Sequence, residues 1–578
     1  MKIEKIRHSL AHILAYAVQE LYPEVKFGMG PSIENGFYYD FDLTPAAKGE
    51  PRSLGREELP KIEKRMKKII KQDIEFKKKI VSKTEAKKIF KNQPYKLELI
   101  EDLPEKRVSI YQSGKFIDLC KGPHVRSSKE IPVDAFKLNR IAGAYWRGLE
   151  RNPMLTRIYG IAFRTKKELA SHLAKEAEAE KRDHRTLGQK LELFTMDEEV
   201  GAGLPLWLPK GAVLRRIIEN YLYKELSSQG YYWIVTPHIA KLDLWETSGH
   251  WNLYRENMYS PIKIDEEEYM LKPMNCPFHV KVYQFKIRSY KDLPLKLAEL
   301  GTVYRYEKSG VLHGLTRVRG FTQDDAHVIC EPGQLSIEVT KLLKSGLKIL
   351  KTFGFKDYDI YLSTRPEKYA GTPKGWEKAI NTLKYALNKL KLRYQIDPGG
   401  GVFYGPKIDI KIKDSLGRPW QCTTIQVDFN LPERFKMTYV NKSGKKQEPF
   451  MLHRALLGSI ERFIGVLLEN YAGALPLWLA PVQIWVILIG TRHEKYAKEV
   501  GEKLGALGLR VEIKDENETV SKKIREGEVQ KIPYLLVVGD REKKAKSVRV
   551  RQRKKGDIGM MKLTKFIEKA KMEMKKKK

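Results

Sequence analysis

The chain is poor in cysteine. Its 578 residues include four cysteines, Cys120, Cys276, Cys330 and Cys422, and none lies close to another in the sequence. A chain of this length buries a sizeable core without covalent cross-links, so a disulfide framework is not expected. The cysteine content therefore excludes a disulfide-rich secreted scaffold and indicates a reducing compartment.

Long uninterrupted apolar runs are also missing. The longest apolar stretch, residues 473–490, contains two prolines and a glutamine, and predicts a linker followed by a buried strand rather than a membrane span. The first residues lack the apolar segment of a signal peptide, because His8 and His12 interrupt it. We therefore expect a cytoplasmic protein that makes no membrane contact.

Acidic residues are outnumbered. Lys and Arg total 108 against 72 Asp and Glu, a formal net charge of +36, while 42% of the residues are hydrophobic. The apolar content excludes a disordered chain. The cationic excess favours a polyanionic partner such as a nucleic acid. A lysine-rich surface that is merely solvated is the alternative.

The pattern of residues changes along the chain and predicts several domains. Residues 1–165 mix helix and strand, and residues 166–185 are polar nearly all round, which predicts an exposed linker helix. Residues 186–478 contain β-rich stretches such as RPWQCTTIQVDF and close with a predicted helix, HRALLGSIERFIGVLLENYAG. Residues 479–578 alternate strands with helices, which indicates a small separate α/β domain.

The central block carries arginines suited to holding phosphate. Residues 305–327 predict two strands joined by a polar loop that includes Arg305, Glu307 and Arg317. The planar guanidinium binds phosphate oxygens in pairs and stays charged. A solvated arginine-rich hairpin is the alternative.

A further arginine, Arg462, lies on a predicted helix, GSIERFIGVLLEN. Gly458 and Gly465 lie four residues before it and three after it, which places both on its side of that helix. A helix face that has glycine at these two positions lets a nucleotide approach the backbone closely. Simple packing of the helix on a sheet explains the glycines equally well.

One cysteine and two histidines form a candidate metal site. Cys276, His327 and His453 would supply one thiolate and two imidazoles with an open fourth position, as in functional zinc sites. Their separation in the sequence is not a motif. A buried cysteine and two structural histidines are the alternative.

Eight segments, in order, resemble the class II aminoacyl-tRNA synthetases and, within that class, the threonine-specific family. They are FGMGPSIENGFYYDF, DLCKGPHV, LKPMNCP, LHGLTRVRGFTQDDAH, FYGPKIDI, WQCTTIQVDF, HRALLGSIERFIG and LPLWLAPVQ. The resemblance covers essentially the whole chain. It implies an α+β multidomain protein with an α+β editing domain (1–165), a linker helix (166–185), an antiparallel-sheet class II catalytic domain (186–478) and a C-terminal α/β anticodon-binding domain (479–578). It also implies that the ubiquitin-like module common at the family's amino terminus is absent.

The resemblance implies that threonine is activated with ATP and Mg²⁺ and then transferred to tRNA(Thr). The partner is a second copy in a homodimer, with Pro237 at its interface. Arg305 and Arg462 are the implied catalytic residues. The implied ATP-binding residues are Arg305, Glu307, Arg317, Gln421, Thr424 and Arg462. The implied threonine-binding residues, around one Zn²⁺ on Cys276, His327 and His453, are Gln323, Asp325, Tyr404 and Lys407.

A metal that takes both the amino group and the hydroxyl of threonine rejects valine but not serine. The missing methyl group of serine is worth only about 1–3 kcal/mol, so a second selection step is required.

The amino-terminal segment offers a candidate site for this second step. His8 and His12 lie four residues apart on one face of the first helix, opposite its apolar stripe, so we expect them outside the main core. Cys120 and His124 are also four residues apart.

These four residues admit more than one interpretation. From the residues alone, a zinc site is the first interpretation, and separate surface histidines are the alternative. A zinc hydrolase of the HExxH type is disfavoured because HSLAH has Ser9 where the glutamate is needed. The resemblance implies instead an editing site that hydrolyses seryl-tRNA(Thr) without requiring a metal. The implied editing residues are His8, His12, Cys120, His124, Asp118 and Lys96.

The carboxy-terminal domain is expected to read the anticodon. The resemblance assigns this to Asn517, Lys531, Glu542 and Arg551, although many family members have arginine where this chain has Lys531. A synthetase-like regulator that binds nucleic acid without catalysis is the alternative function. Such a protein is expected to lack an ATP-binding arginine or a zinc ligand, and this chain has all of them.

Overall fold

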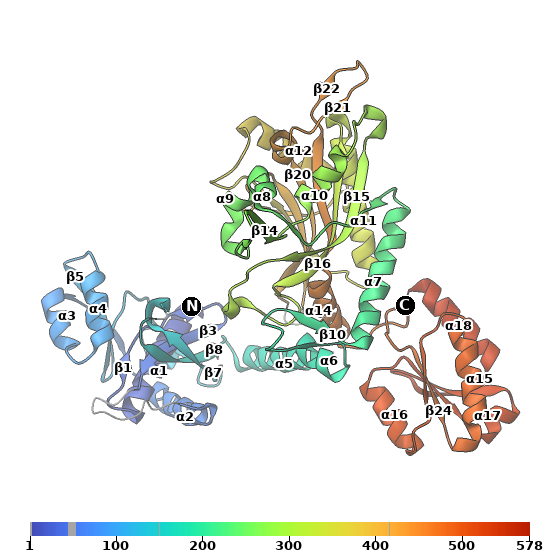
Figure 1. Ribbon diagram of the computed structural model, residues 1–578. Helices are drawn as coiled ribbons and strands as arrows, with labels where there is room; N and C mark the ends of the chain where they lie inside the picture. Colours follow the sequence, from blue (N-terminus) through green and yellow to red (C-terminus); the bar gives the residue numbers. More distant parts are fainter. Residues whose placement is uncertain (1–2, 44–53, 150, 415–416, 578) are drawn as a thin grey trace. The chain divides into compact units, whose positions relative to one another are not determined.

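A computed structural model describes residues 3–43, 54–149, 151–414 and 417–577. The chain divides into two compact units, Met1–Ala177 and Glu178–Lys578 (Figure 1). Within the described ranges, every helix is too short or too polar to cross a bilayer.

The first unit contains two antiparallel sheets with helices packed on them. The larger sheet has the order β1-β3-β8-β7, with β2 paired to β3, and the smaller has the order β4-β5-β6. The strands are β1 Lys26–Phe27, β2 Ser32–Ile33, β3 Gly36–Asp42, β4 Phe76–Ser82, β5 Arg107–Ser113, β6 Phe116–Leu119, β7 Phe136–Tyr145 and β8 Met154–Ala162. The helices are α1 Ile3–Leu21, α2 Leu59–Ile70, α3 Lys83–Ile89 and α4 Pro94–Asp102.

Helix α1 is buried on nearly all sides, which corrects one expectation. It contacts α2, β3 and β6, and its small residues Ala11, Ala15 and Ala17 let these neighbours approach. His12 is consequently 1% exposed, although its face was expected to lie outside the core. His8, one turn earlier, is only partly buried.

The predicted linker helix is interrupted. Helix α5 (Lys166–Arg182) is exposed along most of its length, as expected. It ends before Asp183, whose carboxylate accepts the Arg185 N–H at 2.8 Å and caps a second helix, α6 (His184–Lys190). The prediction of a single helix over 166–185 is therefore wrong, because the Asp183 side chain caps the start of a new helix.

An eight-stranded sheet forms the core of the second unit. Its order is β11-β15-β16-β23-β20-β19-β17-β18, antiparallel except for the two outermost pairs. This confirms the antiparallel-sheet fold implied by the sequence. The strands are β11 Tyr232–Trp233, β15 Leu295–Tyr304, β16 Gly320–Cys330, β17 Tyr358–Ser363, β18 Gln395–Asp397, β19 Lys407–Lys413, β20 Pro419–Asp428 and β23 Phe450–Ser459.

Helices and small ribbons surround this sheet. The helices after α6 are α7 Pro209–Ser227, α8 Leu242–Ser248, α9 His250–Tyr254, α10 Cys276–Gln284, α11 Leu335–Thr352, α12 Pro373–Lys389, α13 Asn430–Arg434 and α14 Ile460–Tyr471. The ribbons are β9 Phe194–Met196 with β10 Pro205–Trp207, β12 Ile239–Lys241 with β13 Ile262–Ile264 and β14 Glu267–Leu271, and β21 Tyr439–Val440 with β22 Lys446–Gln447.

The segment before α14 is a strand, not the predicted start of a helix. The backbone N–H groups of residues 456–458 all donate to the Asp324 carboxylate, where β23 bulges against β16. Gly458, with φ of +76°, ends this stretch in a conformation that suits glycine. Ser459 then caps α14 by accepting the Arg462 N–H. The spacing predicted that Gly458 and Arg462 share a helix. This prediction is wrong, because Gly458 belongs to β23.

The last part of the chain is a five-stranded sheet of order β25-β24-β26-β27-β28, confirming the predicted α/β fold. Helices α15 and α16 both pack on β24 and lie on opposite sides of the sheet (Figure 1). The strands are β24 Ile484–Leu488, β25 Val511–Lys514, β26 Tyr534–Val538, β27 Ser547–Gln552 and β28 Gly556–Lys562, and the helices are α15 Glu494–Gly505, α16 Val520–Val529, α17 Asp540–Lys544 and α18 Leu563–Lys576. The sequence did not predict β28, which has two glycines.

Candidate functional sites

A cavity of about 410 Å³ lies over the eight-stranded sheet, next to the loop between β15 and β16. This volume suits a small-molecule site. Every residue predicted to bind ATP or threonine lines it, namely Arg305, Glu307, Arg317, Gln323, Asp325, Tyr404, Lys407, Gln421, Thr424 and Arg462. Two of the three predicted metal ligands, Cys276 and His453, line it as well.

The arginines concentrate positive charge in this cavity. Arg462 donates from Nε to the Thr316 carbonyl at 3.0 Å and from Nη1 to the Gln421 carbonyl at 3.3 Å. Burial lowers the pKa of Arg462, and the charges of Arg305 and Arg317 act in the same direction. Because both acceptors are neutral carbonyls, the charge of Arg462 is available for an anion.

A buried carboxylate that the sequence analysis missed orients three of the predicted residues. Asp409 on β19 is 2% exposed. Its oxygens lie 2.7 Å from Lys407 Nζ, 2.8 Å from Gln421 Nε2 and 2.9 Å from Thr424 Oγ1. Its signal in the sequence was a single carboxylate between the alternating isoleucines of the strand KIDIKI.

The three predicted metal ligands meet at one end of the cavity. Strands β16 and β23 place His327 directly opposite His453, and α10 begins at Cys276. The His327 Nε2 and His453 Nδ1 atoms lie 2.9 Å apart, and one ligand atom from each of the three residues falls within 4.8 Å of the others. One sulfur and two imidazole nitrogens, all buried, fit Zn²⁺ with an open coordination position.

Further buried groups orient the two imidazoles. His453 Nε2 lies 2.7 Å from Asp428 Oδ2, which leaves Nδ1 as the ligand atom. His327 Nδ1 lies 2.9 Å from His279 Nδ1, and His279 Nε2 lies 3.2 Å from Glu299 Oε2. Hydrogen bonds of this kind fix the tautomer and the ring plane of a metal-binding histidine. None of these three partners was predicted from the sequence, although His279 lies one helical turn after Cys276.

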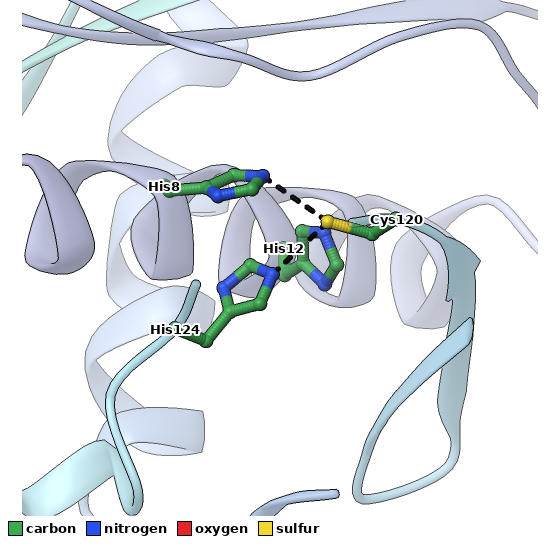
Figure 2. Close-up of side chains that lie close together, drawn as sticks. All are labelled: His8, His12, Cys120 and His124. Carbon is green, nitrogen blue, oxygen red and sulfur yellow. Dashed lines mark hydrogen bonds between the residues drawn. The ribbon is translucent and has the colours of Figure 1, made fainter. Parts of the chain in front are cut away.

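A second cluster lies in the first unit (Figure 2). His8 and His12 project from α1, Cys120 directly follows β6, and His124 lies four residues further along the chain. The Cys120 sulfur is 3.3 Å from His8 Nε2 and 3.2 Å from His124 Nε2. Burial raises the pKa of Cys120 to about 11, so the thiol keeps its proton and acts as a hydrogen-bond donor.

The hydrogen bonds determine the tautomer of His124. The Ser9 hydroxyl donates to the Lys5 carbonyl at 2.8 Å, so its oxygen accepts from His124 Nδ1, 3.1 Å away. His124 Nε2 is therefore unprotonated and faces the Cys120 thiol. Burial also lowers the pKa of His124, which keeps the imidazole neutral.

The two predicted supporting residues join this cluster. The Asp118 carboxylate lies 2.5 Å from Lys96 Nζ and 3.4 Å from His12 Nε2, and it accepts the Tyr39 hydroxyl at 2.7 Å. All four side chains are buried. The structure thus brings together all six residues predicted for editing, and adds Tyr39, which the sequence analysis missed.

The structure places two of the four residues predicted to read the anticodon on the same cavity. Lys531 and Arg551 line one cavity, where Arg551 Nη2 lies 3.4 Å from Glu528 Oε1. Asn517 is exposed in the loop after β25. Glu542 is 7% exposed, and its carboxylate accepts the backbone N–H of Gly539 at the start of α17.

Comparison with known proteins identifies the class. Residues 259–471 match the model of the tRNA synthetase class II core domain (G, H, P, S and T), residues 483–573 that of the anticodon binding domain, and residues 108–159 that of the threonyl and alanyl tRNA synthetase second additional domain. The antiparallel sheet, its arginine-lined cavity and these three matches define a class II aminoacyl-tRNA synthetase.

Relatives identify the family. The chain is 53% identical to the threonine–tRNA ligase of Aquifex aeolicus over 100% of this chain and 90% of that one, and 55% identical to that of Dehalococcoides mccartyi strain CBDB1 over 95% and 93%. The chain belongs to the threonine–tRNA ligase family. The crystal structure of the RNA binding domain of threonyl-tRNA synthetase from Cryptosporidium parvum Iowa II matches with a TM-score of 0.65 and 42% identity, over 68% of this chain and 98% of that one.

Proposed function

We propose that the second unit activates threonine with ATP and transfers it to tRNA(Thr). The proposal rests on one observation: the predicted ATP-binding arginines lie beside the Cys–His–His cluster in the same cavity. A non-catalytic regulator has no use for both features in one place. The test is charging of a tRNA(Thr) transcript with labelled threonine by the purified chain and ATP. Failure to charge would contradict the proposal.

In the activation step, an oxygen of the threonine carboxylate attacks the α-phosphorus of ATP, and pyrophosphate leaves. Arg305 holds the α-phosphate, Glu307 the adenine amino group, and Arg317 and Arg462 the outer phosphates with Mg²⁺. Fixed cations stabilise the charge that develops on the transferred phosphoryl group. Asp409 contributes to this site by holding the side chains of Gln421 and Thr424 in place in the nucleotide pocket.

We propose one Zn²⁺ on Cys276, His327 and His453. When bound, the metal acts as a Lewis acid for the amino group and hydroxyl of threonine. Around it, Gln323, Asp325, Tyr404 and Lys407 shape the remainder of the pocket. Burial raises the pKa of Cys276 well above the ordinary thiol value, with Asp325 and Asp428 adding to the shift, so a cation has to displace the thiol proton.

We propose that the first unit hydrolyses seryl-tRNA(Thr) at the cluster of His8, His12, Cys120 and His124. Neutral imidazoles and a protonated thiol offer both donors and acceptors for a water and for the ester. The Lys96–Asp118 pair holds His12 in the cluster. Hydrolysis consumes water and releases serine and free tRNA, so no redox partner is needed.

Replacing His8 or Cys120 by alanine should slow deacylation of seryl-tRNA(Thr) by about 10²-fold or more, the usual range for one positioned acid or base. The measurement is single-turnover hydrolysis of labelled seryl-tRNA. Threonine-dependent pyrophosphate exchange should be unchanged in the same variants. His172→Ala, on α5 and outside the cluster, is the control. Wild-type deacylation by both variants would contradict the assignment.

We also propose that the chain forms a homodimer through the segment around Pro237. Large apolar side chains are exposed there: Val235 is 94% exposed, Tyr232 66% and Ile239 45%. Apolar groups clustered along a sheet edge favour burial against another copy. β11, which begins this segment, is the edge strand of the eight-stranded sheet.

The substitution Val235→Asp should shift the chain from dimer to monomer in sedimentation velocity at micromolar concentration, because a charge opposes burial of the apolar segment. Ile80→Asp, at a position 58% exposed in the other unit, should leave the dimer intact. A dimer of unchanged stability in the Val235 variant would exclude this face.

The remaining assignments complete the proposal. The domains are 1–165 for editing, 186–478 for activation and 479–578 for binding the tRNA anticodon, where the cavity beside Lys531 and Arg551 is the favoured contact. A cytoplasmic location fits a protein whose four cysteines are all free thiols.

A further inference from the structure

A buried histidine outside the proposed catalytic set contacts the ATP loop, residues 305–319. His184 is the first residue of α6 and is 0% exposed. Its Nδ1 lies 2.8 Å from Glu469 Oε1 on α14, and its Nε2 lies 3.0 Å from the backbone nitrogen of Leu315. No role was predicted for this histidine from the sequence.

The hydrogen bonds define how His184 is protonated. The Leu315 N–H is a donor, so Nε2 must be the acceptor. The ring proton is therefore on Nδ1 and is donated to the Glu469 carboxylate. Both nitrogens are occupied, so a cation bound between His184, Glu469 and the nearby Asp183 would have to break one of these bonds.

The loop backbone lies directly against the imidazole. A Cβ added to Gly314, which has φ of +46°, would stand 2.2 Å from His184 Nε2. One residue beyond Leu315, the Thr316 carbonyl accepts from Arg462 Nε at 3.0 Å. Thr316 and Arg317 then line the cavity. The same short segment is thus held by His184 on one side and by Arg462 on the other.

We propose that His184 is a positioning residue for the ATP step. It fixes the backbone at Leu315 and Thr316, and thereby the placement of Arg317 and Arg462 toward the outer phosphates. The inference rests on the proposed function of the loop. Without an acceptor at Nε2, the buried Leu315 N–H is left unpaired, and the loop conformation that binds ATP is destabilised.

Two substitutions separate the two hydrogen bonds. In His184→Gln, the side-chain oxygen reaches the Nε2 position and still accepts from Leu315. In His184→Asn, the amide reaches the Nδ1 position and still donates to Glu469, but the acceptor for Leu315 is lost. We expect the Asn variant to raise KM for ATP in pyrophosphate exchange by about 10-fold or more, from the usual cost of an unpaired buried donor. The Gln variant should stay within about 3-fold of wild type.

Further measurements distinguish positioning from a general loss of structure. KM for threonine and the rate of seryl-tRNA deacylation should be unchanged in both variants, and thermal unfolding reports on the fold. Gly314→Ala changes the loop without altering His184, and it should also raise KM for ATP, because its Cβ collides with the imidazole. His172→Gln, a histidine on α5 that contacts Phe163, is the matched control.

The outcomes are distinct. A raised KM for ATP in His184→Asn and Gly314→Ala, with rescue in His184→Gln, supports the inference. A wild-type KM for ATP in His184→Asn overturns it, as does an equal rise in the KM values for ATP and threonine in all three variants. If the His184 variants do not fold, Gly314→Ala decides alone. Absence of exchange in the wild-type chain would contradict the proposed function instead.

Discussion

Replacing Arg305 by alanine should lower kcat/KM for ATP in threonine-dependent pyrophosphate exchange by about 10²–10³-fold, the range for loss of one preorganised group that stabilises developing charge. The guanidinium is held before ATP arrives: its Nε donates to the Pro273 carbonyl at 3.2 Å, and it lies 5.1 Å from the centre of the Phe321 ring. Because it is already oriented, it stabilises the phosphoryl charge without reorganisation. Arg305→Lys should restore little of the lost kcat/KM, since an ammonium group cannot bind two oxygens in a fixed plane.

A control isolates the effect of position from that of charge. Arg365 is exposed, stacks on Tyr369 and does not line the cavity. Arg365→Ala removes the same charge and should leave exchange within about 2-fold of wild type, as for most surface changes. If Arg305→Ala retained more than a tenth of the wild-type kcat/KM, Arg305 would not be the group that holds the α-phosphate.

Replacing Cys276 by alanine should reduce bound zinc to a small fraction of one per chain and lower threonine-dependent exchange more than about 100-fold. Loss of a group that only orients a ligand already costs about 10–100-fold, and a direct ligand costs more. The measurements are zinc content by elemental analysis and exchange with threonine. His279→Ala tests the supporting groups and should weaken zinc binding by about 10–100-fold while leaving the three ligands in place.

Cys330→Ala is the matched control for Cys276. Cys330 is also fully buried, but it lies at the end of β16 in the hydrophobic core and outside the metal cluster. This variant should keep its zinc and its exchange activity and lose only some stability. Full zinc occupancy in Cys276→Ala would show that the metal site lies elsewhere.

The candidate residues were predictable from the sequence because short segments carry them. Arg305, Glu307 and Arg317 belong to one loop, and the sheet places that loop beside β16 and β23, which bear His327 and His453. A mostly antiparallel sheet was expected from the resemblance of these segments to the class II synthetases, and the structure has one of eight strands. The resemblance of these segments to a known family was therefore sufficient to select residues that the structure brings to one cavity.

Groups that act through other side chains were not predictable. Asp428 meets His453 through the register of β20 and β23, and register is a long-range property. Glu299 meets His279 because α10 packs against β15, which is equally long-range. Local periodicity also failed before α14, where the backbone N–H groups of residues 456–458 bond to the Asp324 carboxylate on another strand instead of continuing a helix. The burial of His12 was missed for a related reason: an amphipathic wheel does not show that a helix is covered on both sides.

The most direct test is amino-acid-dependent ATP–pyrophosphate exchange with threonine, serine, valine and alanine, run before and after zinc is removed and restored. We expect exchange with threonine, weaker exchange with serine, none with valine or alanine, and loss of the threonine signal on chelation with recovery on addition of zinc. Serine lacks only a methyl group, worth about 1–3 kcal/mol, whereas valine lacks the hydroxyl. Exchange with valine comparable to that with threonine, or threonine exchange that persists in zinc-free protein, would contradict a metal-based selection of threonine in the cavity of the second unit.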